Sequence, residues 1–231
     1  MSRNLRIEYV ERDESWLYGG EVAVPLEITV RDAVVTVCYY PTAKTLVAEF
    51  LRLFGADDFA LFSRDAVLWA TEKFGAFLHE YDFELSPDSY DYYINYALAA
   101  PRAKQHPIVR RLHGGEDFDD LTDTDIDGLI AGGYIVYAAV VDNKIVAVAN
   151  TGEPITEETP REVEIGVDTA EDYRRHGYGK ACVGALASEL ARFGHTAIYE
   201  CASGNTASIR LAESLDGEVV CRKYYIVGFA D

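Results

Sequence analysis

The most informative segment of this chain for its fold is EVEIGVDTAEDYRRHGYGKACVGALASEL, residues 162–190. Its first part places Val163, Ile165 and Val167 at every second position, the alternation of a half-buried strand. A polar loop follows, and apolar residues then recur at helical spacing from Gly179 to about Phe193. The segment therefore predicts a strand, a loop and a helix in succession.

The segments on either side extend this pattern. Before it, Asp142-Asn143 separates two apolar runs, as in a β-hairpin. After it, a strand, a helix and a strand pair or hairpin are expected. An alternation of strands with helices needs at least one crossover connection, so we predict an α/β fold with a mixed (α+β) sheet. These flanking elements are expected at residues 134–141, 144–149, 195–201, 205–215 and 218–229.

The first half of the chain groups its strands before its helices, which predicts a smaller α+β domain. The stretch PRAKQHPIVRR, residues 101–111, contains two prolines and few large apolar residues, as expected for a linker. We therefore predict one domain at residues 1–105 and a second at residues 106–231. In the first, strands are expected at 6–10, 21–30 and 33–40, and helices at 42–54, at 63–81 and from Asp88-Ser89 to just before Pro101.

Composition and charge exclude several classes of protein. Of 231 residues, 49% are hydrophobic, enough for a packed core and too many for a disordered chain. The formal net charge of −18 repels phosphates, so nucleic acid and anionic membrane surfaces are not expected partners. The longest run without a charged residue, 128–141, is too short to span a bilayer, and the N-terminus has no secretion signal.

The cysteines and acidic residues do not form a metal-site pattern. Cys38, Cys182, Cys201 and Cys221 lie far apart without a CxxC pair, so we expect reduced core residues of a cytoplasmic protein.

One acidic segment has the beginning of a calcium loop. Residues 123–128, DTDIDG, match its first half, but Tyr134 stands where a bidentate Glu is needed. We interpret the segment as a helix entry capped by Thr122 or Asp123, and predict no metal.

The loop between the central strand and helix has the composition of an anion site. RRHGYG, residues 174–179, fits the pattern [RQ]-x-x-G-x-[GA]. Glycines allow close backbone approach, and free N–H groups at a helix N-terminus bind anions such as a pyrophosphate. The loop is neither the GxGxxG dinucleotide fingerprint nor a P-loop. On its own, the string is a weak signal, and an ordinary glycine-rich turn between a strand and a helix is the alternative.

The surrounding residues resemble the GCN5-related N-acetyltransferases (GNAT). The loop is similar to that family's acyl-CoA pyrophosphate motif, and EVEIGVDT to the strand before it. GNTASIRLAESL, residues 204–215, resembles the next motif, an Asn opening a helix beside the cofactor. The three motifs occur in the family's order, and the resemblance covers about residues 115–231. It implies a GNAT acyl-CoA N-acyltransferase fold for the C-terminal half.

The resemblance also implies which residues would bind acetyl-CoA as co-substrate. Val167 would hydrogen-bond the pantetheine arm through its main chain, and Gly166 fits a close approach of the cofactor. Asn205 and Ser208 would lie beside pantetheine, whereas Arg174 would brace the loop or touch the ligand. The pyrophosphate would be held by the backbone amides of Arg175, His176, Gly177, Tyr178, Gly179 and Lys180.

Acetyl transfer to an amine needs a group that accepts a proton. Glu164, in the middle of the strand, is the candidate base; a solvent-facing Glu is the competing interpretation, and Glu200 is the reserve. The position of the family's tyrosine acid is occupied by Ala212. Tyr224 or Tyr225 would have to replace it.

The expected activity is transfer of an acetyl group from acetyl-CoA to a primary amine of a small molecule or peptide, by direct attack in a ternary complex. The N-terminal domain would shape the acceptor pocket or form a homodimer. Two alternatives remain open: a non-catalytic acyl-CoA-binding regulatory protein, and an interaction module whose N-terminal half binds a partner.

Overall fold

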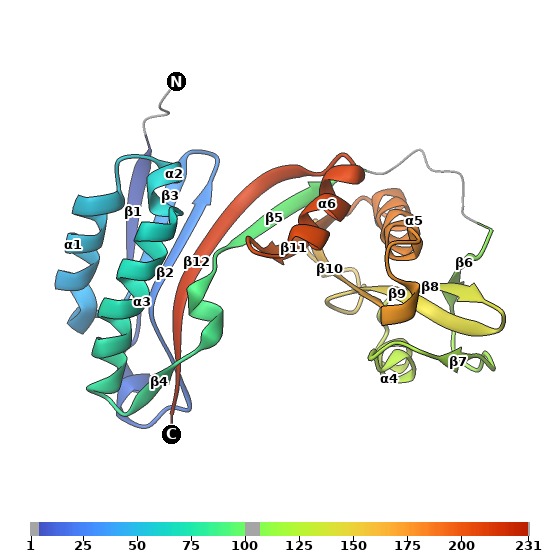
Figure 1. Ribbon diagram of the computed structural model, residues 1–231, viewed down its shortest axis with the longest axis horizontal. Helices are drawn as coiled ribbons and strands as arrows, with labels where there is room; N and C mark the ends of the chain where they lie inside the picture. The colour runs from blue at the N-terminus through green and yellow to red at the C-terminus, as the bar shows by residue number, and fades with distance from the viewer. Residues whose placement is uncertain (1–4, 100–106, 231) are drawn as a thin grey trace. The chain divides into compact units, whose positions relative to one another are not determined.

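The computed structural model describes residues 5–99 and 107–230 (Figure 1). The chain separates into two compact units, and each is described by itself. Unit 1 comprises residues 1–95, 201–205 and 220–231, and unit 2 comprises residues 96–200 and 206–219. The predicted boundary between residues 105 and 106 lies outside the described residues and stays a prediction.

Unit 1 is a sheet covered by helices on one face. Its strand order is β1-β3-β2-β12, and β4 pairs with the end of β12. In Figure 1, α1 and α3 lie side by side against this sheet. Its elements are β1 (Arg6–Glu11), β2 (Val22–Arg31), β3 (Val34–Tyr39), α1 (Lys44–Phe54), α2 (Asp58–Leu61), α3 (Arg64–His79) and β4 (Phe83–Leu85), with short 3-10 turns at Ser15–Tyr18, Pro41–Ala43 and Pro87–Tyr90.

The core of unit 1 is formed by large side chains between the sheet and the helices, among them Phe50, Phe74 and Ile28. Tyr224 from β12 (Glu218–Ala230) is fully buried there, and its hydroxyl donates to the Val67 carbonyl at 3.3 Å. Burial raises the pKa of Tyr224. Because the Tyr224 phenol is buried and its hydroxyl is bonded to a carbonyl of the core, it is not accessible as a proton donor. Tyr224 therefore does not replace the tyrosine acid whose position Ala212 occupies.

Two predicted elements of this part of the chain are wrong. The segment expected to form a third helix begins with a 3-10 turn and continues as strand β5 (Tyr93–Leu98). Tyr and Ile favour strands, and pairing within a sheet overrides a local helical spacing. The expected strand pair at 218–229 is the single long strand β12, which pairs with β2 from Arg222 to Phe229.

Unit 2 contains residues 162–190, the strand, loop and helix from which the fold was predicted. Its sheet has the order β11-β10-β9-β8-β6, with β7 pairing with β9. β8 and β9 form the predicted hairpin, and Asp142 and Asn143 take the left-handed conformation (φ 49° and 63°) that suits a two-residue turn. The elements are β6 (Val109–Leu112), β7 (Asp119–Asp120), α4 (Ile126–Ala131), β8 (Val136–Val141), β9 (Lys144–Thr151), β10 (Glu162–Thr169), α5 (Tyr178–Arg192), β11 (Thr196–Ala202) and α6 (Thr206–Ser214).

Helices lie on both faces of this sheet. The longest, α5, packs on β8, β9 and β10, and α4 contacts β8 on the other side (Figure 1). The predicted strand at 162–167 and helix at 179–193 are confirmed as β10 and α5. The expected α/β fold with a mixed sheet is likewise confirmed, since β10 is parallel to β11 and antiparallel to β9.

A buried carboxylate joins α5 to the sheet. Glu189 is only 5% exposed and accepts hydrogen bonds from the Tyr137 hydroxyl and the Arg111 guanidinium. Burial, followed by the bond to Glu189, raises the pKa of Tyr137 to about 12. The pair of donors compensates the cost of burying the Glu189 charge.

Tyr137→Phe is therefore expected to lower the free energy of unfolding by about 1–3 kcal/mol, because Glu189 stays buried and loses one of its donors. Denaturant unfolding measures the change. Tyr134→Phe is the matched control, because in the described residues the Tyr134 hydroxyl makes no hydrogen bond, and it is expected to change stability little. Equal stability of the two variants would contradict this role for Tyr137.

Candidate functional site

Strand β10 changes its pairing along its length. Residues 162–164 pair in parallel with residues 196–198 of β11, and this pairing ends at Glu164 and Ile198. From Ile165 to Thr169 the strand is paired with β9. Val167 therefore lies beyond the end of the β10–β11 pairing, where a ligand can take hydrogen bonds from the strand in the manner of an added strand.

The loop after β10 is held by its own side chains. Arg174 Nε donates to the Thr169 carbonyl at 3.1 Å, so this side chain braces the loop. His176 Nδ1 lies 2.9 Å from the Arg174 carbonyl, which can only accept, so Nδ1 is the protonated nitrogen. The His176 ring also stacks on Tyr178, with 5.6 Å between centroids and 14° between planes. His176 thus has a structural role in shaping the loop.

The backbone of the loop turns in a way that exposes N–H groups. Arg175 and Gly177 both take left-handed conformations, with φ of 65° and 83°. Such conformations beside ordinary ones direct successive N–H groups to one side and form anion-binding concavities. The left-handed conformation is unusual for a residue such as Arg175 and is maintained here by the surrounding loop.

The N-terminus of α5 continues this arrangement. Gly177 is the residue that precedes the helix, and no side chain caps the first turn. The first N–H groups of a helix have no partner within the helix, and the helix dipole adds positive potential there. The uncapped first turn of this 15-residue helix is therefore available to an anionic group.

Gly179 allows α5 to start directly against β10. A Cβ at this position would lie 2.8 Å from Thr169 Oγ1 and 3.3 Å from Val167 Cγ2. A side chain here would push the helix start away from the strand that carries Val167. Sequence reasoning did not single out Thr169; its position as the last residue of β10, directly before the loop, is the signal that could have found it.

Glu164 is on the exposed face of β10. Its neighbours Val163 and Ile165 are buried on the opposite face. Its carbonyl accepts from the Gly152 N–H at 2.7 Å, which fixes the backbone while the carboxylate stays in solvent. The reserve candidate, Glu200, is half-buried near the end of β11. A carboxylate exposed beside the end of the β10–β11 pairing can accept a proton from a bound amine.

Asn205 and Ser208, the predicted residues of the third motif, differ in their exposure and in their hydrogen bonds. Asn205 is exposed directly before α6, and its N–H donates to the Ala202 carbonyl at 2.9 Å. Ser208, on α6, accepts a 3.0 Å hydrogen bond from the buried Tyr199 hydroxyl. The structure brings Val167, Gly179 and the loop together within unit 2, whereas Asn205 is counted in unit 1.

The position that resembles the family's acid carries no proton donor. Ala212 is fully buried on α6, and its side chain belongs to the core. Tyr225, the other substitute considered, is on β12 and stacks on Tyr93 with 5.1 Å between ring centroids.

The acidic segment after β7 is used for capping and pocket formation. Asp125 caps α4 by accepting from the Gly128 N–H at 3.0 Å, so the predicted caps Thr122 and Asp123 are wrong. Asp123 instead donates its N–H to Asp168 Oδ2 at 2.9 Å. In residues 5–99 and 107–230, no group of three or more His, Cys, Asp or Glu side chains is arranged to hold a metal ion.

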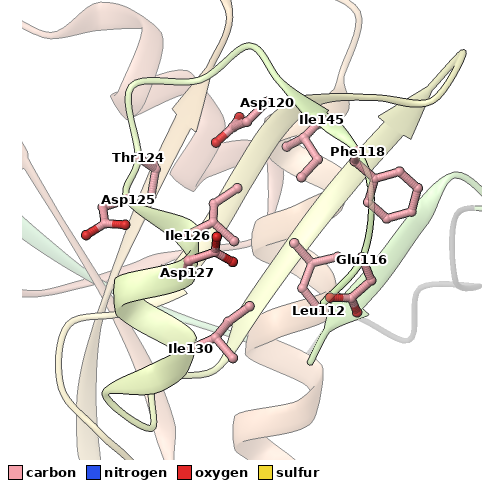
Figure 2. A pocket seen from close by; sticks show the side chains of 10 residues that line it. All are labelled: Leu112, Glu116, Phe118, Asp120, Thr124, Asp125, Ile126, Asp127, Ile130 and Ile145. Atoms are coloured by element: carbon pink, nitrogen blue, oxygen red, sulfur yellow. The ribbon is translucent and has the colours of Figure 1, made fainter. Parts of the chain in front are cut away.

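A pocket of about 220 Å³ lies over this segment, between α4 and the sheet. Figure 2 shows an apolar floor with carboxylates at its edge. None of its lining residues comes from the loop between β10 and α5. The lining residues are Leu112, Glu116, Phe118, Asp120, Thr124, Asp125, Ile126, Asp127, Ile130 and Ile145.

No helix within the described residues has both the length and the apolar composition required to cross a bilayer. None of the four cysteines, all within the described residues, forms a disulfide, and burial raises the pKa of Cys182 to about 12.

Solved structures resemble parts of the chain at low identity. A candidate GNAT-family acetyltransferase from Novosphingobium aromaticivorans is 20% identical, with a TM-score of 0.49; the match covers 61% of this chain and 66% of that one. A GNAT-family acetyltransferase from Colwellia psychrerythraea is 12% identical, with a TM-score of 0.47 and coverage of 84% and 76%. A candidate acetyltransferase from Salmonella typhimurium, solved with its cofactor acetyl-CoA, is 21% identical, with a TM-score of 0.35 and coverage of 46% and 69%. The chain thus spans about two thirds of the length of the first of these.

The sequence itself gives the family. No curated protein is significantly similar to the chain. The model of the Acetyltransferase (GNAT) family, however, matches residues 77–216, more than half of the 231 residues, and includes β10, the loop, α5 and α6. The chain belongs to the GNAT family of acetyltransferases.

Proposed function

We propose that the protein transfers an acetyl group from acetyl-CoA to a primary amine of a small molecule or peptide. The observation that carries this proposal is the uncapped N-terminus of α5. The chain enters this helix through Arg175 and Gly177, which both have left-handed conformations, and the helix starts against the part of β10 that is no longer paired with β11. Coenzyme A has an anionic pyrophosphate, which suits the helix N-terminus, and an extended pantetheine arm, which suits pairing along the strand.

In this proposal the main chain binds the donor. The backbone N–H groups from Arg175 to Lys180 donate hydrogen bonds to the pyrophosphate, and Val167 pairs with the pantetheine arm. From the resemblance of residues 204–215 to the family's third motif, Asn205 is also proposed to bind pantetheine. Ser208 supports the site through its bond with Tyr199 and contacts the cofactor.

Glu164 is the proposed base. The thioester supplies an electrophilic carbonyl carbon, at which the amine nitrogen forms a new C–N bond while the C–S bond breaks. Glu164 accepts the proton that the nitrogen loses, directly or through one water. The departing thiolate takes its proton from solvent, because Ala212 offers none. The acceptor is then any primary amine that reaches the carboxylate; the net charge of −18 attracts cationic amines.

Amine-dependent release of free CoA tests this function. The full-length protein is incubated with acetyl-CoA and a panel of small-molecule and peptide amines, and the free thiol is followed with a chromogenic reagent. We expect release that rises with the concentration of at least one amine and that Glu164→Gln slows about a hundredfold or more. Release that is the same with and without every amine would contradict transfer to an amine.

The buried Ala212 supports a second candidate, a regulatory protein that binds acyl-CoA without turning it over. Saturable binding of acetyl-CoA together with no amine-dependent release would favour this candidate. The cytoplasm is the proposed compartment, since the four cysteines form no disulfide, and a homodimer remains the proposed assembly.

A further inference from the structure

A small group of residues on one face of the unit 2 sheet surrounds the candidate base. Asn150 of β9 lies directly opposite Gly166 of β10. The Gly152 N–H donates to the Glu164 carbonyl at 2.7 Å, which continues the same register to the next pair on that face. Because successive side chains of a strand alternate between its faces, Asn150 shares a face with Gly152, and Glu164 with Gly166. We call these four residues the Asn150 patch (Asn150, Gly152, Glu164 and Gly166).

Contacts within the patch show that its two side chains are on the same face. A Cβ added at Gly166 would lie 3.4 Å from Asn150 Oδ1, and one added at Gly152 would lie 3.4 Å from Glu164 Cβ. Asn150 and Glu164 are therefore diagonal neighbours across two strands. Such neighbours are about 7–8 Å apart, so a small group between them can contact both side chains.

The patch is accessible and lies next to the proposed donor site. Its two glycines leave two of its four corners without a side chain. Glu164 and Gly152 are exposed, and Asn150 and Gly166 are half-buried. Gly166 directly precedes Val167, the residue proposed to pair with the pantetheine arm. An acceptor molecule can therefore enter the patch from solvent and meet the donor there.

The amide of Asn150 is oriented by the next residue of its strand. Its Nδ2 donates to the Thr151 carbonyl at 2.9 Å. A carbonyl can only accept, so the amide nitrogen is on that side, and Oδ1 is the atom nearer Gly166. Across residues 5–99 and 107–230, no hydrogen bond reaches Asn150 Oδ1. Asn150 therefore offers an oriented and open acceptor on the face that also carries the Glu164 carboxylate.

We infer that Asn150 is a specificity-determining residue, which binds the acceptor nitrogen together with Glu164 and selects primary over secondary amines. This inference rests on the proposed function. A neutral primary amine has two N–H groups and one lone pair. The lone pair forms the C–N bond to the thioester carbon while the C–S bond breaks. One N–H proton passes to Glu164, and the remaining N–H donates to Asn150 Oδ1.

A secondary amine cannot serve both acceptors, because its nitrogen has a single N–H. When that proton passes to Glu164, the N-alkyl group takes the place of the second N–H, and Asn150 Oδ1 has no donor. A site that is built to hydrogen-bond a substrate N–H discriminates against an analogue without it, since the polar group of the site is then left unpaired.

A ratio of specificity constants tests the inference on the full-length protein. The acceptors are the primary amine that gives the fastest CoA release in the amine panel and its N-methyl derivative, and kcat/KM is measured for both. The variant is Asn150→Leu, because leucine has the branching of asparagine and lacks the acceptor. We expect it to lower kcat/KM about tenfold for the primary amine and to leave that for the N-methyl derivative unchanged. The calorimetric dissociation constant of acetyl-CoA should not change.

Asn143→Gly is the matched control. The Asn143 side chain, in the turn between β8 and β9, also donates from Nδ2 to a backbone carbonyl, that of Asp117, at 3.2 Å. The substitution removes an equivalent bond, and glycine suits the φ of 63° at this position. The ratio of the two kcat/KM values should equal that of the wild type. If Asn150→Leu does not fold, Asn150→Ala takes its place, with the same expected loss for the primary amine.

Three results would overturn the inference while leaving the proposed function intact. They are wild-type kcat/KM for both amines, an equal loss with both, which would indicate a structural role, and a ratio that changes only because the N-methyl derivative reacts faster. Absence of amine-dependent CoA release by the wild type would instead overturn the proposed function, and this inference with it.

Discussion

Gly177→Val is expected to weaken acetyl-CoA binding about a hundredfold. Gly177 has a φ of 83° and precedes the first turn of α5, so a β-branched residue would change the direction of the N–H groups that follow. Loss of two charge-assisted hydrogen bonds, each about 1.5 kcal/mol, corresponds to roughly a hundredfold. Calorimetric titration of the variant measures the change directly.

Gly194→Val is a closely matched control. Gly194 also has a left-handed conformation, with a φ of 86°, and at both glycines an added Cβ would meet nothing within 4 Å. Each substitution therefore imposes a similar backbone strain, about 1–2 kcal/mol, without a steric clash. Both variants should lose similar stability, but only Gly177→Val should lose affinity. Equal affinities in the two variants would show that the loop does not bind the donor.

The second large effect concerns catalysis. Glu164→Gln is expected to lower kcat about a hundredfold or more, since removal of a general base typically costs this much. The KM for acetyl-CoA should stay unchanged, because the side chain of Glu164 is proposed to receive a proton and the donor is held by main-chain groups elsewhere. Steady-state rates of CoA release at varied acetyl-CoA and amine concentrations separate the two parameters.

Glu162→Gln provides the comparison on the same strand. Glu162 is two residues earlier on β10, is exposed, and has the same charge. A general loss of negative charge would slow both variants alike, whereas a specific base would slow only Glu164→Gln. A wild-type kcat in Glu164→Gln would remove Glu164 from the mechanism and leave Glu200 as the candidate.

The central elements of unit 2 were predictable because local patterns determine them. The alternation of Val163, Ile165 and Val167 predicted β10, and the helical spacing after Gly179 predicted α5. Asp142-Asn143 is a strong local turn signal, and the hairpin was predicted correctly. The glycine-rich loop between a strand and a helix was sufficient to predict an anion site, which stays a prediction.

Other features depend on contacts that no local pattern contains. The apolar residues of Tyr93–Leu98 are compatible with a helix or a strand, and pairing within a sheet stabilises the strand. Local composition also does not show that residues 218–230 form one continuous strand, β12, which pairs with β2.

Several features of the candidate site also could not be predicted from local sequence patterns. The left-handed Arg175 has no signature in sequence, because Arg is not a residue that favours this conformation. The contact of Gly179 with Thr169 depends on how α5 packs on β10. Such contacts emerge only when the chain is folded.

The most direct test of the acetyl-CoA site is calorimetric titration of the full-length protein with acetyl-CoA, beside Gly177→Val and Gly194→Val. We expect saturable binding to one site per chain, retained in Gly194→Val and lost or weakened about a hundredfold in Gly177→Val. No binding by the wild type, or binding that is equal in all three proteins, would contradict the assignment of the loop between β10 and α5 as the acetyl-CoA site.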